Sequence, residues 1–183
     1  DTYSAMAEEV TGHILPVLES YDTNDPHFKQ AISYLRNWDF TYSASETAAS
    51  IMDVFVLHFT RNVLQDEMGP EVYNAFIYYS GQPVRIITRL LRDGSTLFDN
   101  VNTEARESMR DQIITSMQEG LDYLSETRGS EPIEWRWELL HTLTLKSPLF
   151  SEAAQEESAP AGLKLIVQNV LNKGPFPVGG HSY

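Results

Sequence analysis

The histidines of this sequence are the side chains best suited to bind a metal or to transfer protons near neutral pH. No two of them are spaced as in HxxxH or HExxH, so the chain has no helical metal-binding pair. At the edge of an apolar helix face, His58 is expected to pack or to face solvent rather than to ligate. The histidines are His13, His27, His58, His141 and His181. We therefore expect no metal or other cofactor in this chain.

The nucleophilic side chains also lie in no recognisable catalytic motif. The chain contains no cysteine, which excludes disulfides, thiolate metal sites and cysteine nucleophiles. It has no G-x-S-x-G elbow, no Walker A sequence and no G-x-G-x-x-G loop. A Ser-His-Asp triad is recognised by geometry rather than by spacing, so none is assigned. The motifs identify no catalytic residue.

Two carboxylates, Asp66 and Glu67, come at a predicted helix end. Negative charge there opposes the helix dipole by about 0.3–1 kcal/mol per group. Either this is a solvated helix end, or a cationic partner holds the pair. Both interpretations stay open.

An aromatic pair and a glycine-rich segment complete the candidates. Trp135 and Trp137 could stack on a sugar, but packing in a core or interface is expected more often, because aromatic residues dominate buried area. Segment 174–180 could approach a ligand with bare backbone or connect two elements rigidly. No helix start follows it, so it is not expected to hold phosphate.

Composition places these residues in one acidic globular unit. With 183 residues and 42% hydrophobic residues, the chain is long and apolar enough for one folded domain. Its formal net charge of −13 makes nucleic acid and anionic lipid poor partners. No apolar run reaches the ~18 residues of a membrane span.

The dominant hydrophobic period is helical, so we predict a mainly α fold, a bundle of long and short helices. The C-terminal part reads as strand-like at 141–145, as an acidic loop at 151–160 and as a Gly/Pro-rich loop at 174–180. We expect a single helical region over 1–183, with a helical core over 1–130 and an irregular part over 131–183. Helices are predicted over about 3–18, 26–38, 44–68, 70–79, 83–92 and 103–129, the third starting from a capping box at Ser43 and Glu46.

The order of several motifs resembles the penicillin acylase (penicillin amidase) family of N-terminal nucleophile hydrolases. The resemblance covers nearly the whole chain. It departs from the family pattern at Glu138-Leu139 and at 147–150, and 151–159 looks like an insertion. The matching segments are residues 1–4, 35–39, 45–49, 66–69, 97–100 with Thr103 and Glu107, 135–137 with 140–141, 148–149 and 174–180.

The resemblance implies an amidohydrolase that cuts its own precursor into two chains. In the family, the new N-terminal residue of the larger chain, usually serine, attacks an amide carbonyl, and its own α-amino group acts as base. Substrates are N-acyl compounds such as penicillins, cephalosporins and acyl-homoserine lactones. The full fold is a four-layer αββα sandwich with additional helical regions.

Such a nucleophile must be the first residue of its chain. Asp1 does not match it, and Thr2 and Ser4 are internal. In the family, the catalytic asparagine and arginine, and the calcium ligands of some members, lie in segments outside the part that this chain resembles. We therefore expect no catalytic residue, no cofactor-binding residue and no metal ligand here, although calcium is possible in the parent enzyme.

The chain thus resembles an internal, mainly helical part of the large subunit. We expect both of its ends to be points where a longer chain was cut, and we expect a large exposed apolar patch on its surface. Its expected partners are the small subunit and the rest of the large subunit, and the parent would take a small N-acyl substrate in a periplasmic or secreted location. Two alternatives stay open: a free-standing helical binding or scaffold module, and an independent enzyme whose site is undetected.

Overall fold

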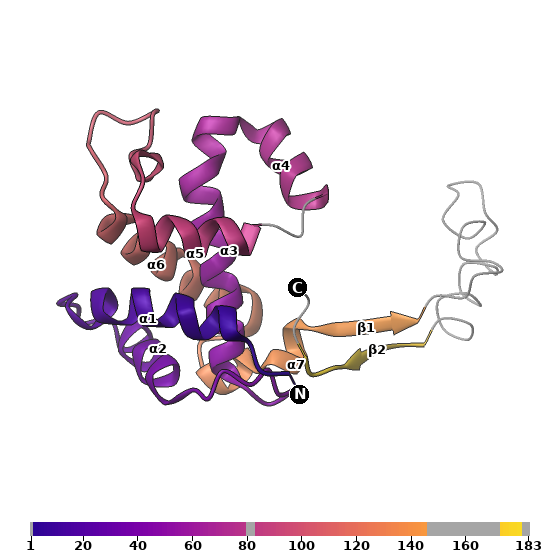
Figure 1. Cartoon of the computed structure of the whole chain (residues 1–183). Coiled ribbons are helices and arrows are strands. Elements are labelled where there is room, and N and C mark those ends of the chain that lie inside the picture. The colour runs from indigo at the N-terminus through magenta and orange to yellow at the C-terminus, as the bar shows by residue number, and fades with distance from the viewer. Residues whose placement is uncertain (1, 80–82, 146–172, 181–183) are drawn as a thin grey trace, which may run out of the picture.

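The structure, a computed structural model, describes residues 2–79, 83–145 and 173–180 and is mainly helical, as predicted (Figure 1). Six of the predicted helices are present. The sequence did not predict the short helix α7 or the two 3-10 turns, η1 and η2. The elements are α1 Ala5–Glu19, α2 Pro26–Asn37, α3 Thr47–Met68, α4 Pro70–Tyr79, α5 Pro83–Asp93, η1 Thr96–Phe98, α6 Met109–Arg128, η2 Pro132–Trp135, α7 Trp137–Leu140, β1 Thr142–Leu145 and β2 Lys173–Pro177.

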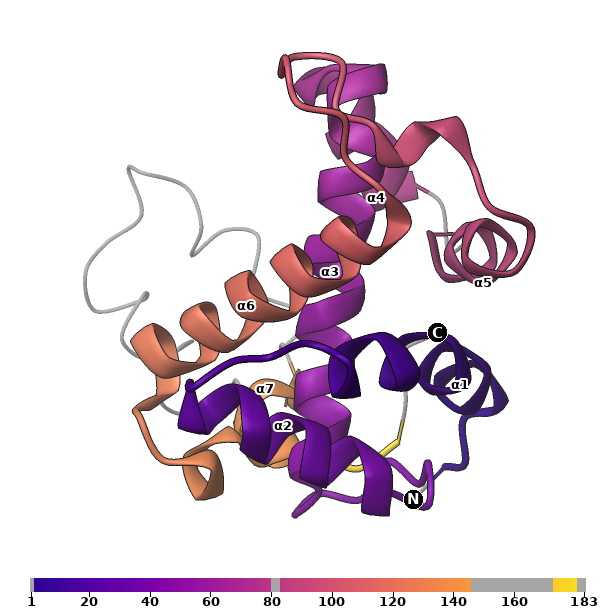
Figure 2. The same cartoon turned by 90° about the vertical axis from the view of Figure 1, so that its left-hand side faces the viewer.

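The long helix α3 runs through the middle of the helical body. Of its 22 residues, 14 are buried. Helix α6 makes the most extensive contact with α3, and α2 packs against α3 as well, while α1 contacts α2, α5 and α6 (Figure 2). At the crossing with α6, a Cβ atom added to Gly120 would lie 3.2 Å from Val54 Cγ2. The glycine therefore lets the two longest helices approach closely.

Local sequence signals position the first two helices as expected. The Ser4 side chain caps α1, and this helix ends at Glu19, soon after the internal Pro16. The Asp25 carboxylate caps α2 and accepts from the backbone N–H of His27 at 2.8 Å, with Pro26 at the first helical position. Proline fits there because that N–H would have no partner within the helix.

The predicted capping box at Ser43 and Glu46 is wrong. Helix α3 begins at Thr47, and Glu46 is itself the cap, since its side chain accepts from the N–H of Ala48. The carbonyls of Ala44 and Glu46 accept from the backbone N–H groups of Glu138 and Trp137. This pairing with the start of α7 holds the segment before α3 out of helical geometry.

The predicted start of the helix over 103–129 is also wrong. Helix α6 begins at Met109, because Ser108 and Asp111 form a reciprocal capping box there. Glu104 and Glu107 consequently lie in the preceding loop rather than in the first turn of a helix.

Two antiparallel strands form a ribbon that projects from the helical body (Figure 1). Strand β1 confirms the predicted strand, but the first half of the predicted loop 174–180 forms β2. The register pairs Thr142 with Pro177 and Leu143 with Phe176, and an irregularity follows before Leu145 pairs with Lys173. Proline is tolerated in an edge strand, and an extra residue is tolerated in a bulge. The prediction of a loop considered neither possibility.

The acidic segment 151–160, the motif at 148–149 and His181 lie outside the described residues. Among the helices that the structure describes, none is both long and apolar enough to cross a membrane.

Candidate functional site

The described histidines lie in separate places. His27 meets the edge of the buried Trp135 ring, and His141 stacks on Trp137 with ring centroids 4.8 Å apart. The partly buried His13 lies on α1, while His58 lies on α3. Within residues 2–79, 83–145 and 173–180, no group of three or more histidine, aspartate and glutamate side chains is arranged to hold a metal ion.

Around His58, a polar cluster joins α3 to α6. Glu119 Oε2 lies 3.2 Å from His58 Nδ1, 3.1 Å from Arg61 Nη2 and 2.9 Å from Asn62 Nδ2. Burial opposes the charged carboxylate, but hydrogen bonds from Asn62 and His58, with the Arg61 charge, hold the pKa of Glu119 below its ordinary value. Asn62 Nδ2 also donates to the hydroxyl oxygen of Ser116 at 3.2 Å. The cluster therefore links α3 to α6 through ion pairs and hydrogen bonds to a single carboxylate.

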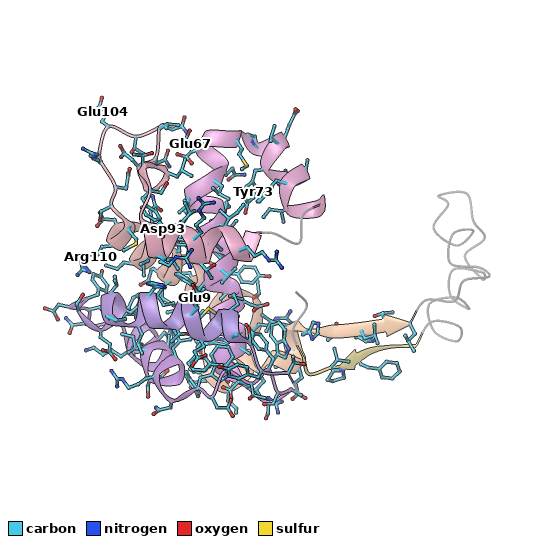
Figure 3. All side chains as sticks on the ribbon, in the orientation of Figure 1. Glu9, Glu67, Tyr73, Asp93, Glu104 and Arg110 are labelled. Carbon is cyan, nitrogen blue, oxygen red and sulfur yellow. The ribbon has the colours of Figure 1, made fainter. Side chains whose placement is uncertain are left out.

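The end of α3 borders a polar cleft of about 500 Å³. Asp66 Oδ2 accepts from the backbone N–H of Val101 at 2.9 Å, while its Oδ1 is buried and has no hydrogen-bond partner among the described residues. Glu67 is exposed, and Figure 3 shows it near the loop that carries Glu104. Asp66 thus binds a loop of this chain, and its second oxygen can accept one more donor. The cleft is lined by Arg61, Asn62, Gln65, Asp66, Gly69, Pro70, Asn100 and Asn102.

The same loop is ordered by its own carboxylates. Glu107 accepts from the hydroxyl of Thr103 at 2.8 Å and from the N–H of Asn100 at 3.0 Å. Both bonds lower the pKa of Glu107, and the bond from the Thr103 hydroxyl has the larger effect. Asp99 in turn accepts from the N–H of Glu107 at 3.0 Å. The resembling motifs at 97–100, Thr103 and Glu107 therefore meet in one structural turn beside Asp66.

Both candidate tryptophans are buried, so packing is confirmed over an open stacking platform. Trp135 Nε1 donates to the carbonyl of Gly129 at 2.8 Å, and Trp137 Nε1 donates to the carbonyl of Gly180 at 2.9 Å. The N–H of Gly180 donates to the carbonyl of Tyr42 at 2.8 Å. The second half of segment 174–180 is thus a rigid connection between the ribbon and the helical body.

Tyr42 connects this junction to a carboxyl on α3. Its buried ring lies 5.2 Å from the rings of Trp38 and Trp137, and its hydroxyl donates to Asp53 Oδ1 at 2.9 Å. Burial raises the pKa of Asp53 to about 7, while the bond from Tyr42 acts in the opposite direction.

Sequence reasoning missed the roles of Asp53 and Glu119. A signal for Asp53 was available, because it is a lone acid inside the apolar run 51–56 of a predicted buried helix. No local signal marks Glu119, since its partners His58 and Arg61 are about sixty positions away along the chain.

Among the described residues, these clusters join helices α3 and α6, a loop and the root of the ribbon. A family model described as penicillin amidase matches residues 1–183. The chain belongs to the penicillin amidase family. This confirms the resemblance read from the motifs.

Curated relatives within this family carry a more specific name. The chain is 27% identical over 182 residues to the acyl-homoserine lactone acylase QuiP of Pseudomonas aeruginosa, a match that covers 92% of this chain and 21% of the relative. It is 25% identical over 162 residues to the protein of the same name from Pseudomonas syringae pv. syringae, covering 83% of this chain and 18% of the relative. The penicillin amidase homologue described here therefore spans about a fifth of the length of these relatives.

Proposed function

We propose that this chain is a non-catalytic, structural part of a larger penicillin-amidase-like hydrolase. That parent hydrolyses the amide bond of N-acyl compounds, with an N-terminal serine nucleophile outside these residues. The observation that carries the proposal is a family match over the whole chain that accounts for only about a fifth of the relatives. The buried core, running from α1 to α7, gives this part the rigidity that a supporting element requires.

Acyl-homoserine lactones are the substrates that the names of the relatives favour. Penicillin-type β-lactams are the second class, which the family name supports. Both contain an amide between an acyl group and an amine, so one acyl-transfer mechanism serves either class.

The remaining properties of the parent follow from the family resemblance. We assign any calcium site of the parent to residues outside this chain. The small subunit and the rest of the large subunit are the proposed protein partners, in a periplasmic or secreted location.

Turnover by the complete protein and by the 183-residue chain alone tests this proposal. Both are incubated with an N-acyl-homoserine lactone and with a chromogenic N-acyl amide, and the released amine is quantified. The complete protein is expected to release amine, and the chain alone is expected to release none above buffer. Turnover that purifies with the chain alone would contradict the structural role, while a complete protein inactive on both substrates would contradict the acylase assignment.

A further inference from the structure

The ribbon of β1 and β2 has one apolar face that no other described residue covers. Leu143 and Phe176 are paired directly across the strands, which places their side chains on the same face. Within β1, Leu145 follows Leu143 by two residues, so strand alternation predicts the same face for Leu145 and the other face for Thr144, although the register with β2 shifts between Leu143 and Leu145. The exposed fractions are 47% for Leu143, 53% for Leu145 and 45% for Phe176.

The ribbon is held firmly at its root and projects from the body (Figure 1). The carbonyl of His141 accepts from the N–H of Val178 at 3.2 Å, and the carbonyl of Gly180 accepts from Trp137 Nε1. A two-stranded ribbon standing in water is marginally stable, because it buries little apolar surface. A fixed root and an apolar face that the described part of the chain leaves exposed are the features of a surface that packs against another element.

Both described ends of the chain lie beside this root. The N–H of Tyr42 donates to the carbonyl of Thr2 at 2.9 Å, and the carbonyl of Tyr42 accepts from the N–H of Gly180 at 2.8 Å. In a longer protein, polypeptide that precedes Thr2 or follows Gly180 therefore starts next to the ribbon. The relatives hold about four fifths of their length outside the matched region, so such polypeptide is abundant there.

We propose that the face formed by Leu143, Leu145 and Phe176, here called the ribbon face, packs against an apolar surface of the parent polypeptide outside residues 1–183. This inference rests on the proposed function, since it requires a parent enzyme. It identifies the ribbon as the interface through which this helical part docks on the rest of the protein. The opposite face, which carries Thr142 and Thr144, stays in contact with water.

Thiol labelling tests the ribbon face, because the natural chain has no cysteine. Leu143→Cys and the matched control Thr144→Cys are made both in the 183-residue chain and in the complete protein. The rate of maleimide modification at each position is followed by peptide mass mapping. Phe176→Cys gives a second reading of the same face, and far-UV circular dichroism confirms that each variant is folded.

Labelling of Leu143→Cys and Phe176→Cys is expected to be slower in the complete protein than in the chain alone by about tenfold or more, since a covered thiol reacts only through local opening. Thr144→Cys is expected to react at similar rates in both. Unchanged rates at Leu143 and Phe176 would overturn the proposal, and so would equal slowing at Thr144. If labelling of the chain alone becomes slower as the concentration of the chain rises, a second copy covers the ribbon face, and the proposal is wrong.

Substrate turnover, measured on the same samples, separates the two proposals. An active parent with an unprotected ribbon face refutes only the docking, and an inactive parent with a protected ribbon face refutes only the acylase function. A gene product that consists of this chain alone would overturn the docking, because no further polypeptide would then exist to cover the face.

Discussion

The titration of Asp53 makes the stability of this chain depend on pH in a calculable way. Asp53 lies on α3 with its Oδ1 2.9 Å from the hydroxyl of Tyr42, and burial raises its pKa from 3.8 to about 7. The folded chain therefore keeps this carboxyl group protonated up to a higher pH than the unfolded chain does. Asp53→Asn keeps the shape of the side chain and removes the titration.

The sign follows from linkage. Below pH 3.8 both the folded and the unfolded chain bind the proton, so the group does not change the free energy of unfolding. As the pH rises from 3.8 towards 7, the unfolded chain releases the proton first, so the folded state loses stability relative to it. A shift of about three units corresponds to a loss of about 4 kcal/mol, of which about 2.6 kcal/mol falls between pH 5 and pH 8. The uncharged amide of the Asp53→Asn variant does not suffer this loss, because it has no proton to release.

Urea unfolding followed by tryptophan fluorescence from pH 5 to pH 8 measures the effect and stays above the isoelectric point of about 4.7. The stability of Asp53→Asn relative to the natural chain is expected to rise by about 2.6 kcal/mol over this range. Asp22→Asn makes the same chemical change at an exposed position of the described chain, and its difference from the natural chain is expected to stay flat. A flat or falling difference for Asp53→Asn would refute the reasoning.

Substitutions at three further positions test the packing by urea unfolding at pH 7. Trp137→Phe leaves the carbonyl of Gly180 without its donor and is expected to cost about 1–2 kcal/mol, whereas no loss would show that this bond does not secure the ribbon. Gly120→Leu forces side-chain atoms against Val54 and is expected to cost about 1–3 kcal/mol, more than Gly120→Ala; equal costs would contradict the close crossing of α3 and α6. Glu119→Gln is expected to cost about 1 kcal/mol, because the acceptor loses its charge at a partly exposed site, and a gain in stability would contradict the tie.

The sequence predicted those elements that depend on local signals. Asp25 before Pro26 defined the start of α2, and Gly129 defined the end of α6, because caps act within a few residues. Where tertiary contacts compete with a local signal, the prediction failed. At Ser43 and Glu46, backbone bonds to the start of α7 displaced the expected capping box.

The site-level contacts were less predictable for the same reason. Asp66 was noticed as an acid at a helix end, but its partner Val101 lies 35 positions away and has no side-chain signature. Strand β2 was predicted as a loop, since its prolines disfavour a central strand, and no sequence rule placed it opposite β1. The resemblance to the family depended on the order of motifs rather than on local structure, and the family model over residues 1–183 confirms it.

The central claim is that the reacting residue lies outside this chain, and covalent trapping in the complete protein tests it most directly. A sulfonyl fluoride that modifies an activated serine is added, substrate turnover is followed until it is lost, and the modified peptide is located by mass spectrometry. The account predicts that the modification maps to the N-terminal residue of a chain segment outside residues 1–183. Inactivation that tracks a modified serine or threonine within residues 1–183 would contradict it.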